Sequence, residues 1–136
     1  MPKIYVAGAS KEWAQVRIYM RALQETGWTI AYDWTIDVEA NEGSPNGDAD
    51  LPAGTRMRHA LQDARAVLEA DLFWLIVPNG PGTGAWFEFG LAHHKSESLT
   101  IVSGNYRKSI FSELADRRFE SHTEALIFCQ HLRSKV

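Results

Sequence analysis

The sequence has little cysteine, little net charge and no long apolar run. Its single cysteine, Cys129, excludes an internal disulfide and a cysteine-rich metal site, and its apolar neighbours predict a core position. The formal net charge is only −3, and Lys and Arg are scattered, which argues against a surface that binds nucleic acid polymers. The longest apolar run, Leu72 to Pro78, is far too short to span a bilayer, so we expect no membrane partner.

The start of the chain also lacks the pattern of a secretion signal. Met1-Pro2-Lys3 leads into an apolar run without a basic segment, a long apolar stretch and a cleavage site, and we therefore expect a cytoplasmic protein. The chain has 136 residues, of which 45% are hydrophobic and 23% are charged. This size and composition predict one folded domain over residues 1–136.

Short apolar runs alternate with helical periodicity along the chain. Strands are predicted at residues 4–8, 28–32, 72–77 and 99–102, with a short edge strand at 118–120. Helices are predicted at residues 11–26, 57–68, 84–95 and 123–133. This alternation predicts an α/β fold, a flavodoxin- or Rossmann-like parallel sheet of about five strands with helices on both faces. In such sheets ligands bind beyond the carboxyl ends of the strands.

Residues 33–53 interrupt this alternation. They lose periodicity and collect Asn, Gly, Ser, Pro and Asp, which predicts a loop of about twenty residues. Loops of this length in a compact domain often serve as lids. Whether residues 35–53 close over a substrate is left open.

Glu88 is the only formally charged side chain between Leu72 and His94. Its neighbours are apolar or small, and a carboxylate is costly to bury there unless it is paired or functional. It also falls in the first turns of a predicted helix at the carboxyl edge of the sheet, where the helix dipole favours an anion. The alternative is that Glu88 lies on the exposed stripe of that helix.

The glycine-rich turn before Glu88 is a second candidate. Gly80-Pro81-Gly82-Thr83-Gly84 can bring a sugar or phosphate close to backbone N–H groups at a helix start, although a plain tight turn has the same composition. It does not fit a Walker loop. The segment after the first strand, Gly8 to Lys11, offers a single glycine and no dinucleotide fingerprint.

Other polar residues have simpler interpretations. Asp63 lies about 120° from the apolar stripe of Met57, Leu61 and Ala64, a position typical of a solvated helix face. Asp71 precedes a strand and is expected to cap a turn. His93 and His94 point about 100° apart, and no third ligand is evident, so no metal site is predicted.

Together these segments resemble one family. The run Lys3 to Gly8, then Asp63 eight residues before Asp71, then Gly82 to Ala92 with Glu88 at its centre, resemble the nucleoside 2-deoxyribosyltransferases and their relatives that hydrolyse deoxynucleoside monophosphates. The resemblance extends over roughly residues 3–102. Its most specific part is the Gly-Thr, Glu, Gly, Ala sequence from Gly82 to Ala92.

The resemblance implies a site and a reaction. Glu88 would be the nucleophile that forms a glycosyl ester at C1′, Asp63 would position or activate it and the incoming group, and Tyr5 would hold the nucleophile. Substrate would be bound by residues after the first and third strands: Gly8, Ser10, Lys11, Gly82, Thr83 and Gly84. A small-molecule nucleoside or nucleotide is the expected partner, and no cofactor is expected.

Two departures from the family pattern leave the reaction subtype open. The transferases tend to carry an aspartate six residues before the nucleophile and the monophosphate hydrolases a serine, whereas this chain has Gly82. The hydrolases also use a serine and an arginine after the first strand, where this chain offers Ser10 and Lys11. The sequence is compatible with base transfer, with hydrolysis and with a non-catalytic nucleotide-binding module. Trp86 and Phe87 favour a core or subunit contact over base stacking.

The family resemblance also bears on assembly. Members usually form homodimers or larger oligomers in which a neighbour completes the pocket. Residues 105–115 are therefore candidates for a contribution in trans.

Overall fold

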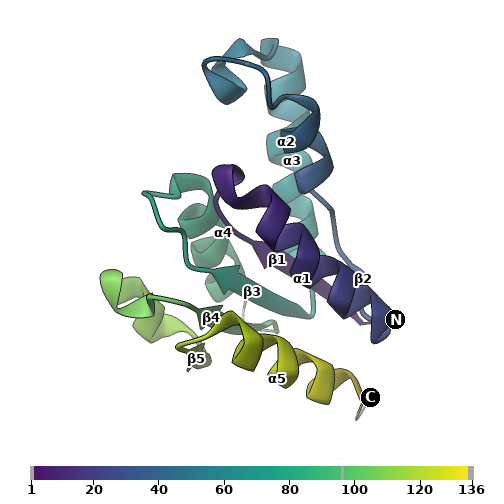
Figure 1. Cartoon of the computed structure of the whole chain (residues 1–136), viewed down its shortest axis with the longest axis vertical. Helices are drawn as coiled ribbons and strands as arrows, with labels where there is room; N and C mark the ends of the chain where they lie inside the picture. The colour runs from purple at the N-terminus through teal and green to yellow at the C-terminus, as the bar shows by residue number, and fades with distance from the viewer. Residues whose placement is uncertain (1, 96, 135–136) are drawn as a thin grey trace.

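The fold is a five-stranded, all-parallel sheet flanked by helices (Figure 1). The structure is a computed structural model that describes residues 2–95 and 97–134, so residues 1, 96, 135 and 136 of the predicted domain lie outside it. The strand order is β2-β1-β3-β4-β5, and the strands are β1 (Lys3–Ala7), β2 (Thr29–Ile30), β3 (Leu72–Ile76), β4 (Leu99–Ser103) and β5 (Arg117–Phe119). The predicted α/β class and flavodoxin-like architecture are confirmed.

The helices form one layer on each face of the sheet. The helix α1 (Trp13–Glu25) and α5 (His122–Ser134) cover one face, and α3 (Ala53–Glu69) and α4 (Thr83–His94) cover the other (Figure 1). Four short 3-10 turns join these elements: η1 (Ser10–Glu12), η2 (Gly47–Asp50), η3 (Tyr106–Lys108) and η4 (Ile110–Leu114). Among the described residues, no helix combines the length and apolar character needed to cross a membrane.

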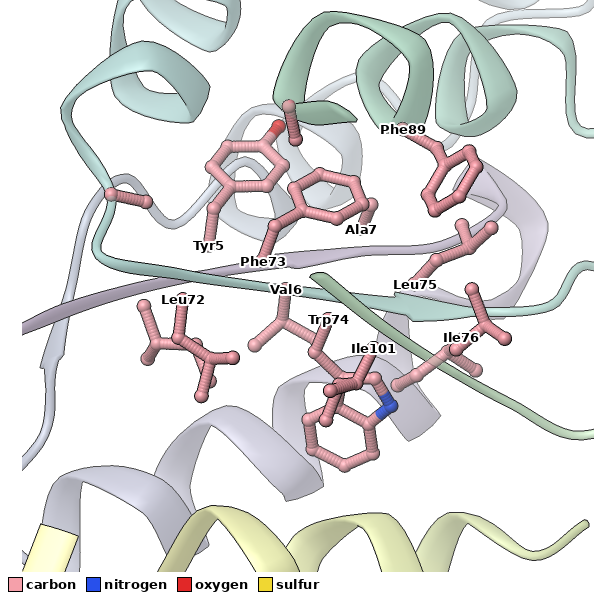
Figure 2. Close-up of a cluster of buried hydrophobic side chains, with 14 of the residues drawn as sticks. Tyr5, Val6, Ala7, Leu72, Phe73, Trp74, Leu75, Ile76, Phe89 and Ile101 are labelled. Atoms are coloured by element: carbon pink, nitrogen blue, oxygen red, sulfur yellow. The ribbon is translucent and has the colours of Figure 1, made fainter. Parts of the chain in front are cut away.

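The core consists of two apolar layers separated by the sheet (Figure 2). All five residues of β3 are buried, as the unbroken apolar run from Leu72 requires of a central parallel strand. Successive side chains of a strand point to opposite faces. Tyr5 and Phe73 therefore stack on the α3/α4 side, while Trp74 lies on the α1/α5 side, where its indole N–H donates to Ser103 Oγ at 2.8 Å.

Residues 33–53 do not form one irregular loop, which corrects the sequence-based prediction. They contain α2 (Thr35–Ala40) as well as η2. The start of α2 is fixed by contacts that have no periodic signature. Asp33 Oδ1 accepts from the Thr35 backbone N–H at 3.0 Å, and the Trp34 indole N–H donates to the Val6 carbonyl at 2.8 Å.

The orientation of α3 is a second correction. The expected apolar stripe faces outward, because Met57, Leu61 and Leu68 are 62%, 44% and 43% exposed. The residues that α3 buries against the sheet are the small Ala66 and Val67 near its end. In α1, by contrast, the apolar residues that recur every three to four positions face the core, since Val16, Met20 and Leu23 are buried.

Candidate functional site

A cavity of about 720 Å³ opens where the direction of strand order reverses. The chain runs from β1 outward to β2 and returns to β3 on the other side of β1, so the crevice lies beyond the carboxyl ends of β1 and β3. Its volume is within the range of small-molecule sites, about 300–1,000 Å³. Three segments form its walls: the residues after β1, the turn and first half of α4 after β3, and α2 with the facing side of α3.

Glu88 lies on α4 at this cavity and is held by a tyrosine from β1. The Tyr5 hydroxyl donates to Glu88 Oε2 at 2.6 Å. Tyr5 is fully buried, and its ring stacks on Phe73 with ring centroids 5.9 Å apart. Burial, followed by the negative charges of Glu88 and Asp63, raises the pKa of Tyr5 well above its ordinary value. The phenol therefore stays protonated and remains a donor to Glu88.

The pKa of Glu88 is raised from 4.5 to about 8. Burial is the largest cause, the hydrogen bond from Tyr5 acts in the opposite direction, and the charge of Asp63 raises the pKa further. The exposed-stripe alternative is therefore wrong, because Glu88 is partly buried and bonded from the core. Strongly perturbed carboxyl groups in a cleft are typical of functional sites.

Asp63 lines the same cavity from α3. Its pKa is raised from 3.8 to about 6, first by burial and then by the charge of Asp37, while His59 lowers it. The position predicted to be a solvated face is thus a cavity wall. Two carboxyl groups of different pKa share one cavity, an arrangement that suits acid–base and nucleophilic roles.

The glycine turn is shaped at Gly82, which has left-handed backbone angles of φ 55° and ψ 45°. A Cβ added there would lie 2.2 Å from Cγ of Pro78, so only glycine fits beneath the proline ring. The Gly82 carbonyl accepts from the Trp86 backbone N–H at 3.2 Å and opens α4. All six residues expected to bind substrate line the cavity: Gly8, Ser10, Lys11, Gly82, Thr83 and Gly84.

The α2/α3 wall contains functional candidates that sequence reasoning missed. Asp37 accepts from the Tyr32 hydroxyl at 2.5 Å and lies 3.9 Å from His59 Nε2. Arg56, His59 and Asp63 line the cavity from one face of α3. Their spacing of three and four residues is that of a polar helix stripe, of which only Asp63 was among the predicted site residues.

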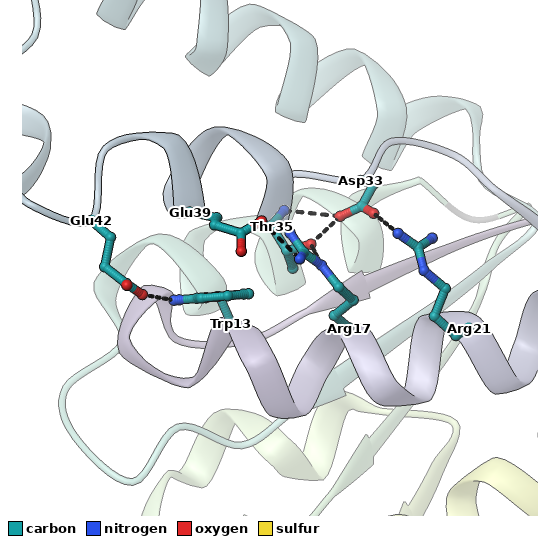
Figure 3. A network of polar contacts seen from close by, with 7 residues as sticks. All are labelled: Trp13, Arg17, Arg21, Asp33, Thr35, Glu39 and Glu42. Carbon is teal, nitrogen blue, oxygen red and sulfur yellow. Dashed lines mark hydrogen bonds and ion pairs between the residues drawn. The ribbon is translucent and has the colours of Figure 1, made fainter.

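α2 is tied to α1 by a polar network (Figure 3). Arg17 donates from Nε to Thr35 Oγ1 at 3.0 Å and from Nη1 to Glu39 at 2.9 Å. The Trp13 indole N–H donates to Glu42 at 2.7 Å. These contacts hold the segment that brings Asp37, Val38, Asp48 and Leu51 to the cavity.

Comparisons with protein-family models, curated proteins and solved structures found no match to this chain. The resemblance to nucleoside 2-deoxyribosyltransferases therefore rests on the residues quoted above.

The remaining polar and aromatic residues that the sequence singled out have structural contacts or lie at the rim of the cavity. Asp71 accepts from the Lys3 backbone N–H at 2.9 Å, and Cys129 is buried, as expected. Within residues 2–95 and 97–134, no group of three or more His, Cys, Asp or Glu residues is arranged to hold a metal ion. Trp86 packs edge-on against Phe89 in the core, whereas Phe87 is 65% exposed at the rim of the cavity.

Proposed function

We propose that this protein cleaves the N-glycosidic bond of a nucleoside or deoxynucleoside through Glu88 and transfers the sugar to a second base. The observation that carries the proposal is the Tyr5–Glu88 pair, a partly buried carboxyl held at 2.6 Å beside a cavity that Asp63 also lines. The site thus has a carboxylate nucleophile, a second acid and space for a small ligand, which retaining glycosidic chemistry requires.

The proposed reaction has two steps. In the first, a Glu88 carboxylate oxygen bonds to C1′ as the C1′–N bond breaks, and the electron pair stays on the base nitrogen while Asp63 supplies a proton. In the second, the nitrogen of an incoming base attacks C1′, its proton passes to Asp63, and the Glu88 carboxylate leaves. Tyr5 holds one carboxylate oxygen, so that the other is free to attack.

The acid–base state of the site predicts its pH dependence. A nucleophile must be ionised, and a pKa of about 8 leaves about a tenth of Glu88 ionised at pH 7. The proton donor Asp63 must be protonated, and its pKa is about 6, so the gain from ionising Glu88 is offset by the loss of this proton. The rate should therefore rise up to about pH 6, stay nearly level between about pH 6 and 8, and fall above pH 8. Positive charge developing on the sugar in the transition state further favours the ionised carboxylate.

The charge of the cavity favours an uncharged nucleoside as substrate. Acidic lining residues outnumber the basic ones, Lys11, Arg56 and His59; the acids are Glu12, Asp37, Asp48, Asp63 and Glu88. Glu12 also accepts from the Asn79 backbone N–H at 3.2 Å. This N–H, at the start of the turn, is therefore not free to donate to a phosphate. This balance supports base transfer between nucleosides.

Hydrolysis of a nucleoside 5′-monophosphate is the second candidate. Ser10 and Lys11 lie at the same cavity as Gly82, Thr83 and Gly84 at the start of α4. A hydroxyl, an ammonium group and helix N-terminal N–H groups are together a suitable set of phosphate ligands. Water would then replace the second base.

The test is an incubation with deoxynucleosides and with deoxynucleoside 5′-monophosphates, each with and without a free acceptor base, followed by chromatography. Base exchange would support the transferase, whereas free sugar or sugar phosphate alone would support the hydrolase. Glu88→Ala should abolish either activity, and Glu25→Gln, at an exposed glutamate that ends α1, should leave it unchanged. Tight nucleotide binding without any product would contradict both and favour a binding module.

A further inference from the structure

The turn between β3 and α4 is held by side chains rather than by its own backbone. Outside helices and strands, the backbone-to-backbone hydrogen bonds of residues 2–95 and 97–134 involve neither the N–H nor the C=O of residues 78–81. This turn nevertheless determines where α4 begins. Glu88 lies six residues after Gly82, about 9 Å along the helix at 1.5 Å per residue.

Two charged side chains make up for the missing backbone contacts. Lys108 Nζ, from η3, donates to the Gly80 carbonyl at 2.7 Å and to the Pro78 carbonyl. Glu12, from η1, accepts from the Asn79 backbone N–H at 3.2 Å and from Asn79 Nδ2 at 2.6 Å. Three consecutive residues of the turn are therefore bonded by an ammonium group and a carboxylate, and charge-assisted bonds of this kind are the stronger ones.

The sheet topology explains why these two segments reach the turn. β1 and β4 are the two neighbours of β3, and all three strands are parallel, so they end at the same edge. η1 follows β1 and η3 follows β4. η1 and η3, which follow β1 and β4, thus hold the turn that follows β3.

We infer that Lys108 and Glu12 form a clamp that positions the glycine turn, and through it α4 and Glu88, for the reaction. Lys108 is a positioning residue, because it does not line the cavity and acts through the carbonyls of Pro78 and Gly80. This inference rests on the proposed function, because only a reaction at Glu88 makes its position matter. It also gives Lys108, which lies in the segment 105–115 named as a candidate for a contribution in trans, a role within its own chain.

The first test replaces Lys108 by methionine, which keeps the length of the side chain but removes its donors. The matched control is Arg107→Met, which removes a neighbouring cation that pairs at 3.1 Å with Glu120 on the surface. Misplacing a catalytic group by about 1 Å can lower the rate about 100-fold. We therefore expect Lys108→Met to lower kcat about 10- to 100-fold with a smaller change in KM. Lys108→Arg, which keeps the donors, should restore most of kcat.

The second test does not depend on activity. Amide hydrogen exchange at Asn79 and Trp86, whose N–H groups donate to Glu12 and to the Gly82 carbonyl, should accelerate at least about tenfold in Lys108→Met and stay unchanged in Arg107→Met. If Lys108→Met fails to fold, Glu12→Met, which removes both acceptor oxygens, tests the other side of the clamp, with faster exchange expected at Asn79. Unchanged exchange in the folded variant would overturn the clamp even if the wild-type enzyme is active.

The two tests separate failure of the clamp from failure of the proposed function. Faster exchange in a wild-type background that turns over no nucleoside would retain the clamp and reject the function. Faster exchange with an unchanged kcat in an active enzyme would overturn the positioning role of Lys108.

Discussion

Replacing Glu88 by glutamine changes the head group from an acid to a neutral amide of nearly the same shape. Its effect on stability follows from the raised pKa. In the folded protein the pKa of Glu88 is about 8, against an ordinary value of 4.5. Below pH 4 the folded and unfolded chains both hold the proton. Between about pH 4.5 and 8 the unfolded chain ionises while the folded chain keeps its proton, so the stabilising contribution of this group is lost as pH rises through about 8.

The size of this effect on the free energy of unfolding follows from the difference between the two pKa values. A pKa difference of about 3.5, at about 1.36 kcal/mol per unit, gives an upper bound of about 5 kcal/mol above pH 8. Glu88→Gln has no charge to bury, so its advantage over the wild type should grow from near zero at pH 4 to about 2–5 kcal/mol at pH 8.5. Such a gain in stability on removing a functional group is common in active sites.

Urea unfolding of both proteins at intervals between pH 4 and 9 measures this advantage directly. Glu25→Gln, the same chemical change at an exposed position on α1, should follow the wild type at every pH. A constant difference between wild type and Glu88→Gln across this range would refute the raised pKa and, with it, the electrostatic account of the site.

Three further predictions concern the surroundings of Glu88. Tyr5→Phe removes the hydrogen bond that lowers the pKa of Glu88, so the fall in rate above about pH 8 should move to higher pH and the maximal rate should decrease; an unmoved high-pH limb would contradict this role. Gly82→Ala should destabilise the protein by at least about 2 kcal/mol in thermal unfolding, because it forces a left-handed residue into the Pro78 ring. Gly84→Ala, with open space around its Cβ, is the control and should be neutral or stabilising. Arg17→Met should speed amide exchange across α2 while the sheet stays protected, and equal exchange in wild type and variant would show that the network does not hold α2.

The parts of the fold that the sequence predicted share a local physical signal. β3 is buried at every position, and a central strand of this kind has an unbroken apolar run that no other short element needs. α1 has a periodic apolar stripe that is buried as expected. β2 is shorter than predicted, with only Thr29 and Ile30 paired, because it is an edge strand with one neighbour.

The parts that could not be predicted depend on tertiary contacts. α2 has six residues, too few to be stable alone, and contacts of Arg17, Trp34 and Asp33 fix it. Periodicity predicts the wrong inward face for α3, because the polar residues Arg56, His59 and Asp63 line the cavity while the larger apolar residues of the helix face outward. Periodicity alone cannot tell a cavity wall from a solvated face.

The candidate site shows the same division. Glu88 was visible as a lone charge in an apolar segment, whereas Tyr5 and Asp63 were named through the family resemblance. The geometry adds that Tyr5 bonds to Glu88 and that Asp63 raises its pKa. Lys108 contacts Gly80, 28 positions away in the sequence, and Glu12 contacts Asn79, 67 positions away. No local sequence pattern predicts these contacts.

The proposed function requires a covalent bond between Glu88 and the sugar. A nucleoside with fluorine at C2′ destabilises the oxocarbenium-like transition states, so the glycosyl-enzyme should persist long enough to be measured. Intact-protein mass spectrometry should then show one added fluorinated sugar. Peptide mapping should locate it on Glu88, and the adduct should be missing from Glu88→Gln. Turnover of nucleosides without an adduct, or with the adduct on another residue, would contradict the covalent role of Glu88.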